Sequence, residues 1–205
     1  MKKLMTIAAL IITASMNLFA ENLARNGNFE QLIAGKSAEW RIHQYSNETE
    51  IKFFADGSEN GGYAQMIFPI DNKSAGRMML SQDVTAAVKS KQKYQLSCKV
   101  RGKGFKGVAE LILCNDKWAA SAGILMGKVP GKWTEFKKIV TMPEFKKQAK
   151  LNFNVKRVAK GTIEVTDIKL EKVESNYRPE ELLAGAEDKY MDKELHRKFI
   201  REYNS

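Results

Sequence analysis

Residues 93–101 read KYQLSCKVR and residues 161–172 read GTIEVTDIKLEK. In both stretches apolar and polar side chains alternate with a period of two, which is the pattern of a β-strand with one buried face. The same alternation occurs in KWTEFKKIV (132–140) and in AKLNFNV (149–155). These stretches predict that the central part of the chain is built from β-strands.

Turn-forming residues separate these stretches at short intervals. They are Gly35, Gly57, Gly61 and Gly62, Gly76, Gly102 and Gly104, Gly127, Pro130 and Gly131, and Gly161. This spacing favours an antiparallel sandwich over an alternation of strands and helices. We therefore expect an all-β fold, with about ten strands in one antiparallel β-sandwich over residues 21–175.

The pattern changes after residue 175. Pro179 is followed by two glutamates, which is typical of a helix start because the acids oppose the helix dipole. Met191, Leu195, Phe199 and Tyr203 then recur every four residues. The pattern predicts an amphipathic α-helical tail over residues 176–205. Two interpretations stay open for it: a helix that packs back on the sandwich, or a helix that docks on a protein partner or acts as a linker.

The first 20 residues have the order of an export signal. Lys2 and Lys3 precede an apolar run over residues 4–14, and the small Ala20 ends the segment. The run is shorter than the roughly 20 residues that a membrane-spanning helix needs. We expect a signal peptide over residues 1–20, and a secreted or periplasmic protein without a membrane span.

The net charge of +10 at pH 7 favours anionic partners. The lysines are spread over nearly every predicted strand, and the sequence has no arginine-rich stripe and no aromatic RNA-binding motif. We therefore expect no nucleic-acid partner. Acidic glycans or an anionic cell envelope fit an exported basic protein better.

The sequence lacks the motifs of nucleophilic and zinc catalysis. His43 and His196 are its two histidines, and it contains no GxSxG, HExxH, P-loop or GxGxxG motif. A pair of carboxylates for glycoside hydrolysis stays open, since two distant acids can meet in a fold. We expect a protein that is not an enzyme.

The two cysteines are predicted to be free. Strand alternation places Cys98 and Cys114 on opposite faces, and a hairpin around residues 102–107 would put them out of register. Two cysteines on opposite faces and out of register lie too far apart to form a disulfide bond.

Five stretches and one tryptophan occur in the order and spacing of one family. They are NLARNGNFE (22–30) with Trp40, MLSQDV (79–84), YQLSCKV (94–100), GKWTEF (131–136) and IEVTDIKL (163–170). Over residues 22–172 the chain resembles the CenC-type carbohydrate-binding modules of families four, nine and twenty-two. The resemblance implies a galactose-binding-like jelly roll, with Trp40 and Trp133 as packed tryptophans.

The resemblance also implies a structural calcium ion near the meeting point of the first and last strands. The family holds it with a glutamate of the N-terminal motif and an aspartate of the last strand, which here are Glu30 and Asp167. Turn carbonyls around Asn26 would add further hard oxygens of the kind that calcium prefers. The alternative is that both acids are ordinary surface side chains.

A sugar site on such a fold needs rings for stacking and amides for hydrogen bonds to hydroxyls. Trp118 and Tyr63 follow polar or glycine-rich turns and are the rings expected to be exposed. Asn152, Asn154 and Gln95 occupy the non-core positions of their strands.

These features predict a secreted, non-catalytic module that binds a polysaccharide or oligosaccharide on an open face or loop rim. The alternative is an envelope or adhesion module that uses the same sandwich for protein contacts.

Overall fold

The computed structural model describes residues 21–45, 49–58, 61–69, 76–115 and 120–173. The predicted signal peptide, the predicted helical tail and Trp118 lie outside these ranges. Ten strands form the regular structure within them: β1 (Leu32–Ile33), β2 (Lys36–Ser37), β3 (Arg41–Gln44), β4 (Glu50–Ser58), β5 (Gly61–Phe68), β6 (Gly76–Asp83), β7 (Lys93–Asn115), β8 (Ser121–Met126), β9 (Thr134–Thr141) and β10 (Ala149–Lys172). The prediction of an all-β sandwich is confirmed for this part of the chain. Within the same ranges, no helix has the length and apolarity needed to cross a membrane.

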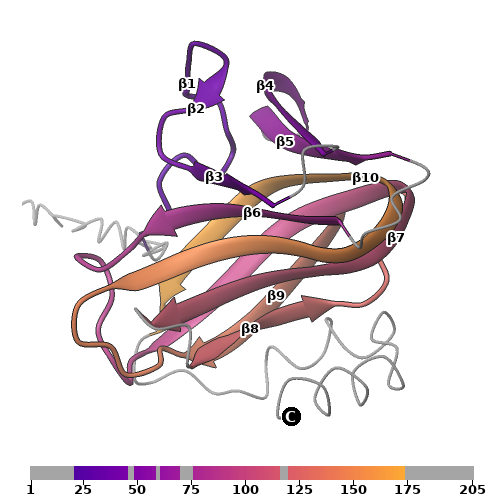
Figure 1. Cartoon of the computed structure of the whole chain (residues 1–205). Helices are drawn as coiled ribbons and strands as arrows, with labels where there is room; N and C mark the ends of the chain where they lie inside the picture. Colours follow the sequence, from indigo (N-terminus) through magenta and orange to yellow (C-terminus); the bar gives the residue numbers. More distant parts are fainter. Residues whose placement is uncertain (1–20, 46–48, 59–60, 70–75, 116–119, 174–205) are drawn as a thin grey trace, which may run out of the picture.

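The strands build two antiparallel layers that face each other (Figure 1). Layer A consists of β3, β6, the first half of β10, the second half of β7, and β8, in that order of pairing. Layer B consists of β4, β5, the second half of β10, the first half of β7, and β9. Strands β1 and β2 form a separate hairpin.

Strands β7 and β10 are continuous and belong to both layers, so the hairpin considered around residues 102–107 does not form. They stay paired along their length and bend together where they pass from layer A to layer B (Figure 1). At the bend Gly104 and Gly161 have positive φ angles of 61° and 100°. A Cβ atom on Gly161 would lie 2.4 Å from the carbonyl oxygen of Gly104. The glycines therefore permit a backbone approach that a side chain would prevent.

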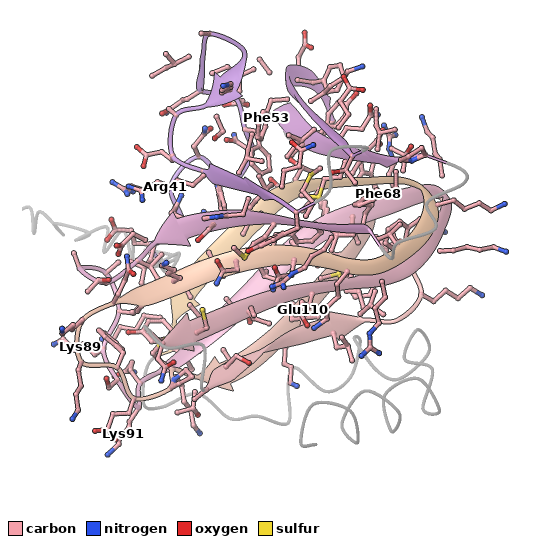
Figure 2. The ribbon with its side chains drawn as sticks, viewed as in Figure 1. Arg41, Phe53, Phe68, Lys89, Lys91 and Glu110 are labelled. Carbon is pink, nitrogen blue, oxygen red and sulfur yellow. The ribbon has the colours of Figure 1, made fainter. Side chains whose placement is uncertain are left out.

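The space between the layers is filled by the apolar residues of the alternating pattern, whose side chains Figure 2 draws on the ribbon. Leu96 of β7 and Phe153 of β10 have no exposed surface. Cys98 belongs to this core, whereas Cys114 is buried outside the main core cluster. Burial raises the pKa of both thiols, that of Cys114 to about 11. The prediction of two free thiols is confirmed.

The N-terminal segment is attached to the last strand. The Asn22 side-chain oxygen accepts a hydrogen bond from the Leu170 backbone N–H at 3.0 Å, and the Gly27 carbonyl accepts one from Ile168 at 3.0 Å. A Cβ atom on Gly27 would lie 1.9 Å from the Ile168 carbonyl oxygen. The expected packed tryptophan, Trp40, is buried, and its indole N–H donates to the Arg25 and Asn26 carbonyls, both at 3.1 Å.

Replacing Trp40 with alanine should lower the free energy of unfolding by about 3–5 kcal/mol, because it leaves a cavity and two carbonyls without their donor. Ile33→Ala is the control, since Ile33 is 70% exposed and its truncation should change stability by no more than about 0.5 kcal/mol. Urea denaturation followed by circular dichroism measures both. Equal effects of the two substitutions would contradict the structural role of Trp40.

Candidate functional site

Three aromatic rings gather on the outer surface of layer B. Phe54 of β4 and Tyr63 of β5 are opposite each other in register, with ring centroids 4.6 Å apart and planes inclined by 14°. Trp133, just before β9, meets Tyr63 edge-on at 6.1 Å. Their neighbours Phe53 and Ala64 point into the core, so alternation turns Phe54 and Tyr63 outward. We call Phe54, Tyr63 and Trp133 the ring cluster; all three are half-buried.

A row of polar side chains runs beside the ring cluster across three adjacent strands. Gln65 of β5, Glu164 of β10 and Arg101 of β7 are in register. The Arg101 guanidinium binds the Glu164 carboxylate, and the Gln65 amide donates to the same carboxylate at 2.7 Å. Glu164 is 1% exposed, so this pairing offsets the cost of burying its charge.

Arg101 connects the polar row to the rings. Its guanidinium carbon lies 4.6 Å from the Trp133 ring centroid and 5.8 Å from that of Tyr63. Both distances are within the range of cation–π attraction. One side chain therefore holds the position of Trp133 and neutralises Glu164.

The Tyr63 hydroxyl stays protonated over the physiological pH range. Burial raises its pKa above the ordinary value, and the negative charge of Glu164 adds to that effect, while Arg101 opposes it. A protonated phenol both donates and accepts hydrogen bonds. The ring cluster therefore presents apolar faces together with a neutral polar tip.

Asn152 and Asn154 lie on the outer side of layer A, away from the ring cluster. The Asn152 amide donates to the Cys114 sulfur at 3.0 Å, and the Asn154 amide donates to the Glu110 carboxylate at 2.9 Å. Both residues are buried, and neither amide oxygen has a hydrogen-bond partner. In this arrangement the two side chains are buried and their amide nitrogens already donate to protein groups.

Gln95 also lies on layer B, but it is closer to the end of β10 than the ring cluster is. Its amide donates to the Glu171 carboxylate at 3.1 Å. The predicted sugar contacts within the described residues are therefore divided between two layers, and Tyr63 is the one of these that lies in the ring cluster.

Comparison with protein families identifies the sandwich. The model of the family described as "Carbohydrate binding domain" matches residues 21–162. The chain belongs to this family. No curated protein matches it.

Solved structures with the same fold are distant in sequence. The family 61 module TmCBM61, solved with β-1,4-galactotriose, has a TM-score of 0.52 and 17% identity, and the match covers 75% of this chain and all of that module. The CBM22-1 xylan-binding domain from Paenibacillus barcinonensis has a TM-score of 0.51 and 14% identity, with 76% and 97% covered.

A larger protein contains a similar fold. The enzymatically active domain of tailspike protein 4 from bacteriophage CBA120 has a TM-score of 0.57 and 16% identity, and the match covers 74% of this chain and 21% of the tailspike chain. The chain thus spans about a fifth of that structure. At these identities all three similarities show the fold alone.

The two predicted calcium ligands have different surroundings in the structure. The Glu30 side chain is exposed, and its Oε1 atom would lie 2.1 Å from a Cβ atom on Gly61. Asp167 has a φ angle of 51° at a bulge of β10, and its carboxylate pairs with the Lys99 ammonium at 3.3 Å. Within the described ranges, no group of three or more His, Cys, Asp or Glu side chains is close enough to hold a metal ion.

Sequence reasoning missed most of this site. Trp133 was expected in the core and instead lies on the outer surface, because it precedes β9 and turns over Arg101. That expectation is wrong for Trp133. Alternation in β4 marks Phe54 as outward once Phe53 is taken as core, but no local signal shows that Glu164 is buried or that it meets Arg101.

Replacing Arg101 with leucine should lower the free energy of unfolding by roughly 3–5 kcal/mol, because it leaves the buried Glu164 carboxylate without its main counter-charge. The double substitution Arg101→Leu with Glu164→Gln should cost clearly less than the single one, since the buried charge is then gone. Denaturant unfolding of both variants tests this. If the double variant is the less stable of the two, the pairing is not what stabilises Glu164.

Proposed function

We propose that this protein is a non-catalytic module that binds a polysaccharide or oligosaccharide on the outer surface of layer B. The observation that carries the proposal is the ring cluster, in which three half-buried rings lie beside a row of hydrogen-bonding side chains. The family assignment favours this function over protein contacts alone. The exported location predicted by residues 1–20 is part of the proposal.

The chemistry of the ring cluster suits a sugar chain. Each sugar ring has an apolar face of C–H groups, which stacks on an aromatic ring, and a rim of hydroxyls that needs donors and acceptors. Trp133 and Tyr63 supply ring surface, and Gln65 and the Tyr63 hydroxyl supply polar contacts. The cluster lies on an open sheet face, and such a surface accepts the middle of a chain. Trp118 and Gln95 stay predicted contacts.

A structural calcium ion is also proposed. The Phe29 and Phe54 carbonyl oxygens would lie 2.9 Å and 2.2 Å from a Cβ atom on Gly62, and Glu30 lies against Gly61. Carboxylate and carbonyl oxygens thus lie close together around the start of β5. Oxygen is the donor type that calcium prefers. Glu30, Asp167 and these carbonyls are the groups that would hold the ion. Bound calcium would compete with Lys99 for the Asp167 carboxylate.

Replacing Trp133 with alanine should weaken saccharide binding by about 1–3 kcal/mol, because the largest ring of the cluster is lost. A glycan array first selects the saccharide, and isothermal titration calorimetry then compares the wild type, Trp133→Ala and the control Tyr45→Ala. Tyr45 is 54% exposed and lies at the end of β3, outside the cluster.

Wild-type affinity in Trp133→Ala would contradict the location of the site. Release of reducing sugar by a highly purified sample, lost on replacement of a pair of acids, would contradict the non-catalytic function.

Calcium should raise the melting temperature, because a ligand that binds the native state alone stabilises it by about 2.7 kcal/mol at a concentration of 100 Kd. For a domain of this size, each kcal/mol of stabilisation raises the melting temperature by roughly 2–4 °C. Scanning calorimetry with chelator and with millimolar calcium measures the shift, and Glu30→Gln should abolish it. Identical melting curves in chelator and in calcium would contradict the proposed calcium site.

A further inference from the structure

A pocket opens at the edge of the sandwich where strands β3 and β4 face each other. β3 is one edge strand of layer A and β4 is one edge strand of layer B, and the β1–β2 hairpin lies beside the opening (Figure 1). The volume of the pocket is about 500 Å³. That is within the range of roughly 300–1,000 Å³ found for small-molecule sites.

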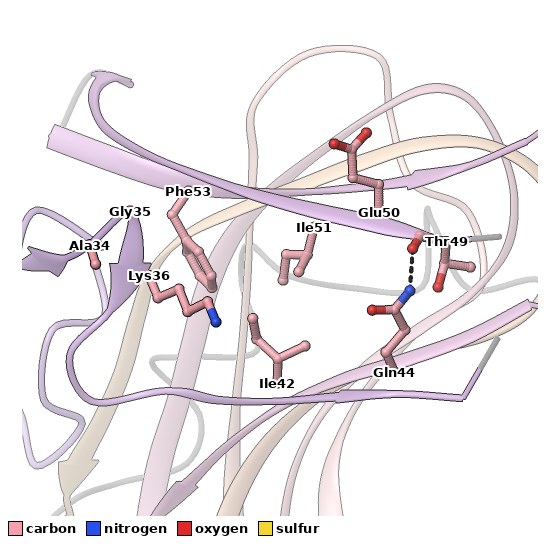
Figure 3. A pocket seen from close by; sticks show the side chains of 9 residues that line it. All are labelled: Ala34, Gly35, Lys36, Ile42, Gln44, Thr49, Glu50, Ile51 and Phe53. Atoms are coloured by element: carbon pink, nitrogen blue, oxygen red, sulfur yellow. Dashed lines mark hydrogen bonds between the residues drawn. The ribbon is translucent and has the colours of Figure 1, made fainter. Parts of the chain in front are cut away.

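The floor of the pocket is apolar and its rim is polar. Ile42, Ile51 and Phe53 form the floor (Figure 3). The Phe53 ring also packs on Phe29 in the core at 5.7 Å, so the floor is closed by the core. Lys36, Gln44, Thr49 and Glu50 complete the rim.

One charge of this rim points into the pocket. The Lys36 side chain extends beside the Phe53 ring with its ammonium group toward the interior (Figure 3). The Glu50 carboxylate points away from the pocket and pairs with the Lys52 ammonium at 3.2 Å (Figure 3). The lining therefore attracts a negative group to the Phe53 end.

The hairpin holds Lys36 in this place. Its two turn residues, Ala34 and Gly35, have φ angles of 50° and 73°, as a tight two-residue turn requires. Lys36 directly follows the turn and pairs with Ile33. On the opposite side, the Gln44 amide donates to the Thr49 carbonyl and ties the end of β3 to the start of β4.

We propose that this edge pocket binds a single hydroxylated ring that carries a carboxylate, such as a uronic acid at the end of a saccharide chain. The apolar floor accepts the C–H face of the ring, the amide and hydroxyl groups of the rim accept its hydroxyls, and Lys36 binds its carboxylate. The choice of a saccharide rests on the proposed function, but the site does not. Alternation along β4 directs Phe53 into the pocket and Phe54 onto the opposite face, so the pocket and the ring cluster are separate.

The test is a titration of the ¹⁵N-labelled full chain with galacturonate, galactose and acetate, followed by heteronuclear NMR. Galacturonate and galactose share a ring and differ in the carboxylate, while acetate has a carboxylate without a ring. Amide signals of residues 34–36, 42–44 and 49–53 should shift with galacturonate. Its affinity should exceed that of galactose by about five-fold, the upper range for a partly exposed ion pair. Acetate should produce no comparable shift.

Lys36→Gln should reduce the affinity for galacturonate to that for galactose. Lys146→Gln, which replaces an exposed lysine outside the pocket, should leave it unchanged. Trp133→Ala should also leave it unchanged. Equal responses to all three probes, or wild-type affinity in Lys36→Gln, would overturn the proposal.

The two proposals fail in different ways. Binding of a longer oligosaccharide that depends on Trp133, without shifts at the pocket, would overturn the pocket alone. Galacturonate binding at the pocket without any effect of Trp133→Ala on oligosaccharides would overturn the ring cluster and support the pocket.

Discussion

The pairing of β7 with β10 is the interaction on which the rest of the structure depends. Both strands run through layer A and layer B. Strands β5, β6, β8 and β9 pair directly with one of the two, and β4 and β3 are added to the outer edges of β5 and β6. The joint bend requires a close backbone contact between Gly104 and Gly161. Because the two layers share these strands, their separation and register are set together, and so are the positions of both candidate sites at their surfaces.

Strand alternation explains why adjacent residues of β4 belong to two different candidate sites, the edge pocket and the ring cluster. In β4, Phe53 closes the floor of the edge pocket, while the adjacent Phe54 faces outward and stacks on Tyr63. A shift of one residue in the register of β4 would exchange these roles. The core contact of Phe53 with Phe29 opposes such a shift, so core packing also preserves the two candidate binding surfaces.

The buried Glu164 carboxylate illustrates how charge can give a surface a defined geometry. A buried ion pair is seldom a large net source of stability, because desolvation opposes the Coulomb attraction. Here the pair places the Arg101 guanidinium over Trp133, and the Gln65 amide completes the carboxylate's hydrogen bonds. The result is a set of rings held in place before any ligand binds, which lowers the entropy lost on binding.

The sequence by itself determined the all-β class, the antiparallel sandwich and the burial of Trp40, because period-two alternation and turn residues are local signals. It also placed Tyr63 on an outer surface. The tertiary structure alone decided that residues 93–115 are one strand rather than a hairpin, since glycine permits both a turn and a bend. It also decided the meeting of Arg101, Glu164 and Trp133, and the burial of Asn152 and Asn154. These features depend on contacts between residues far apart in the chain, which no local pattern records.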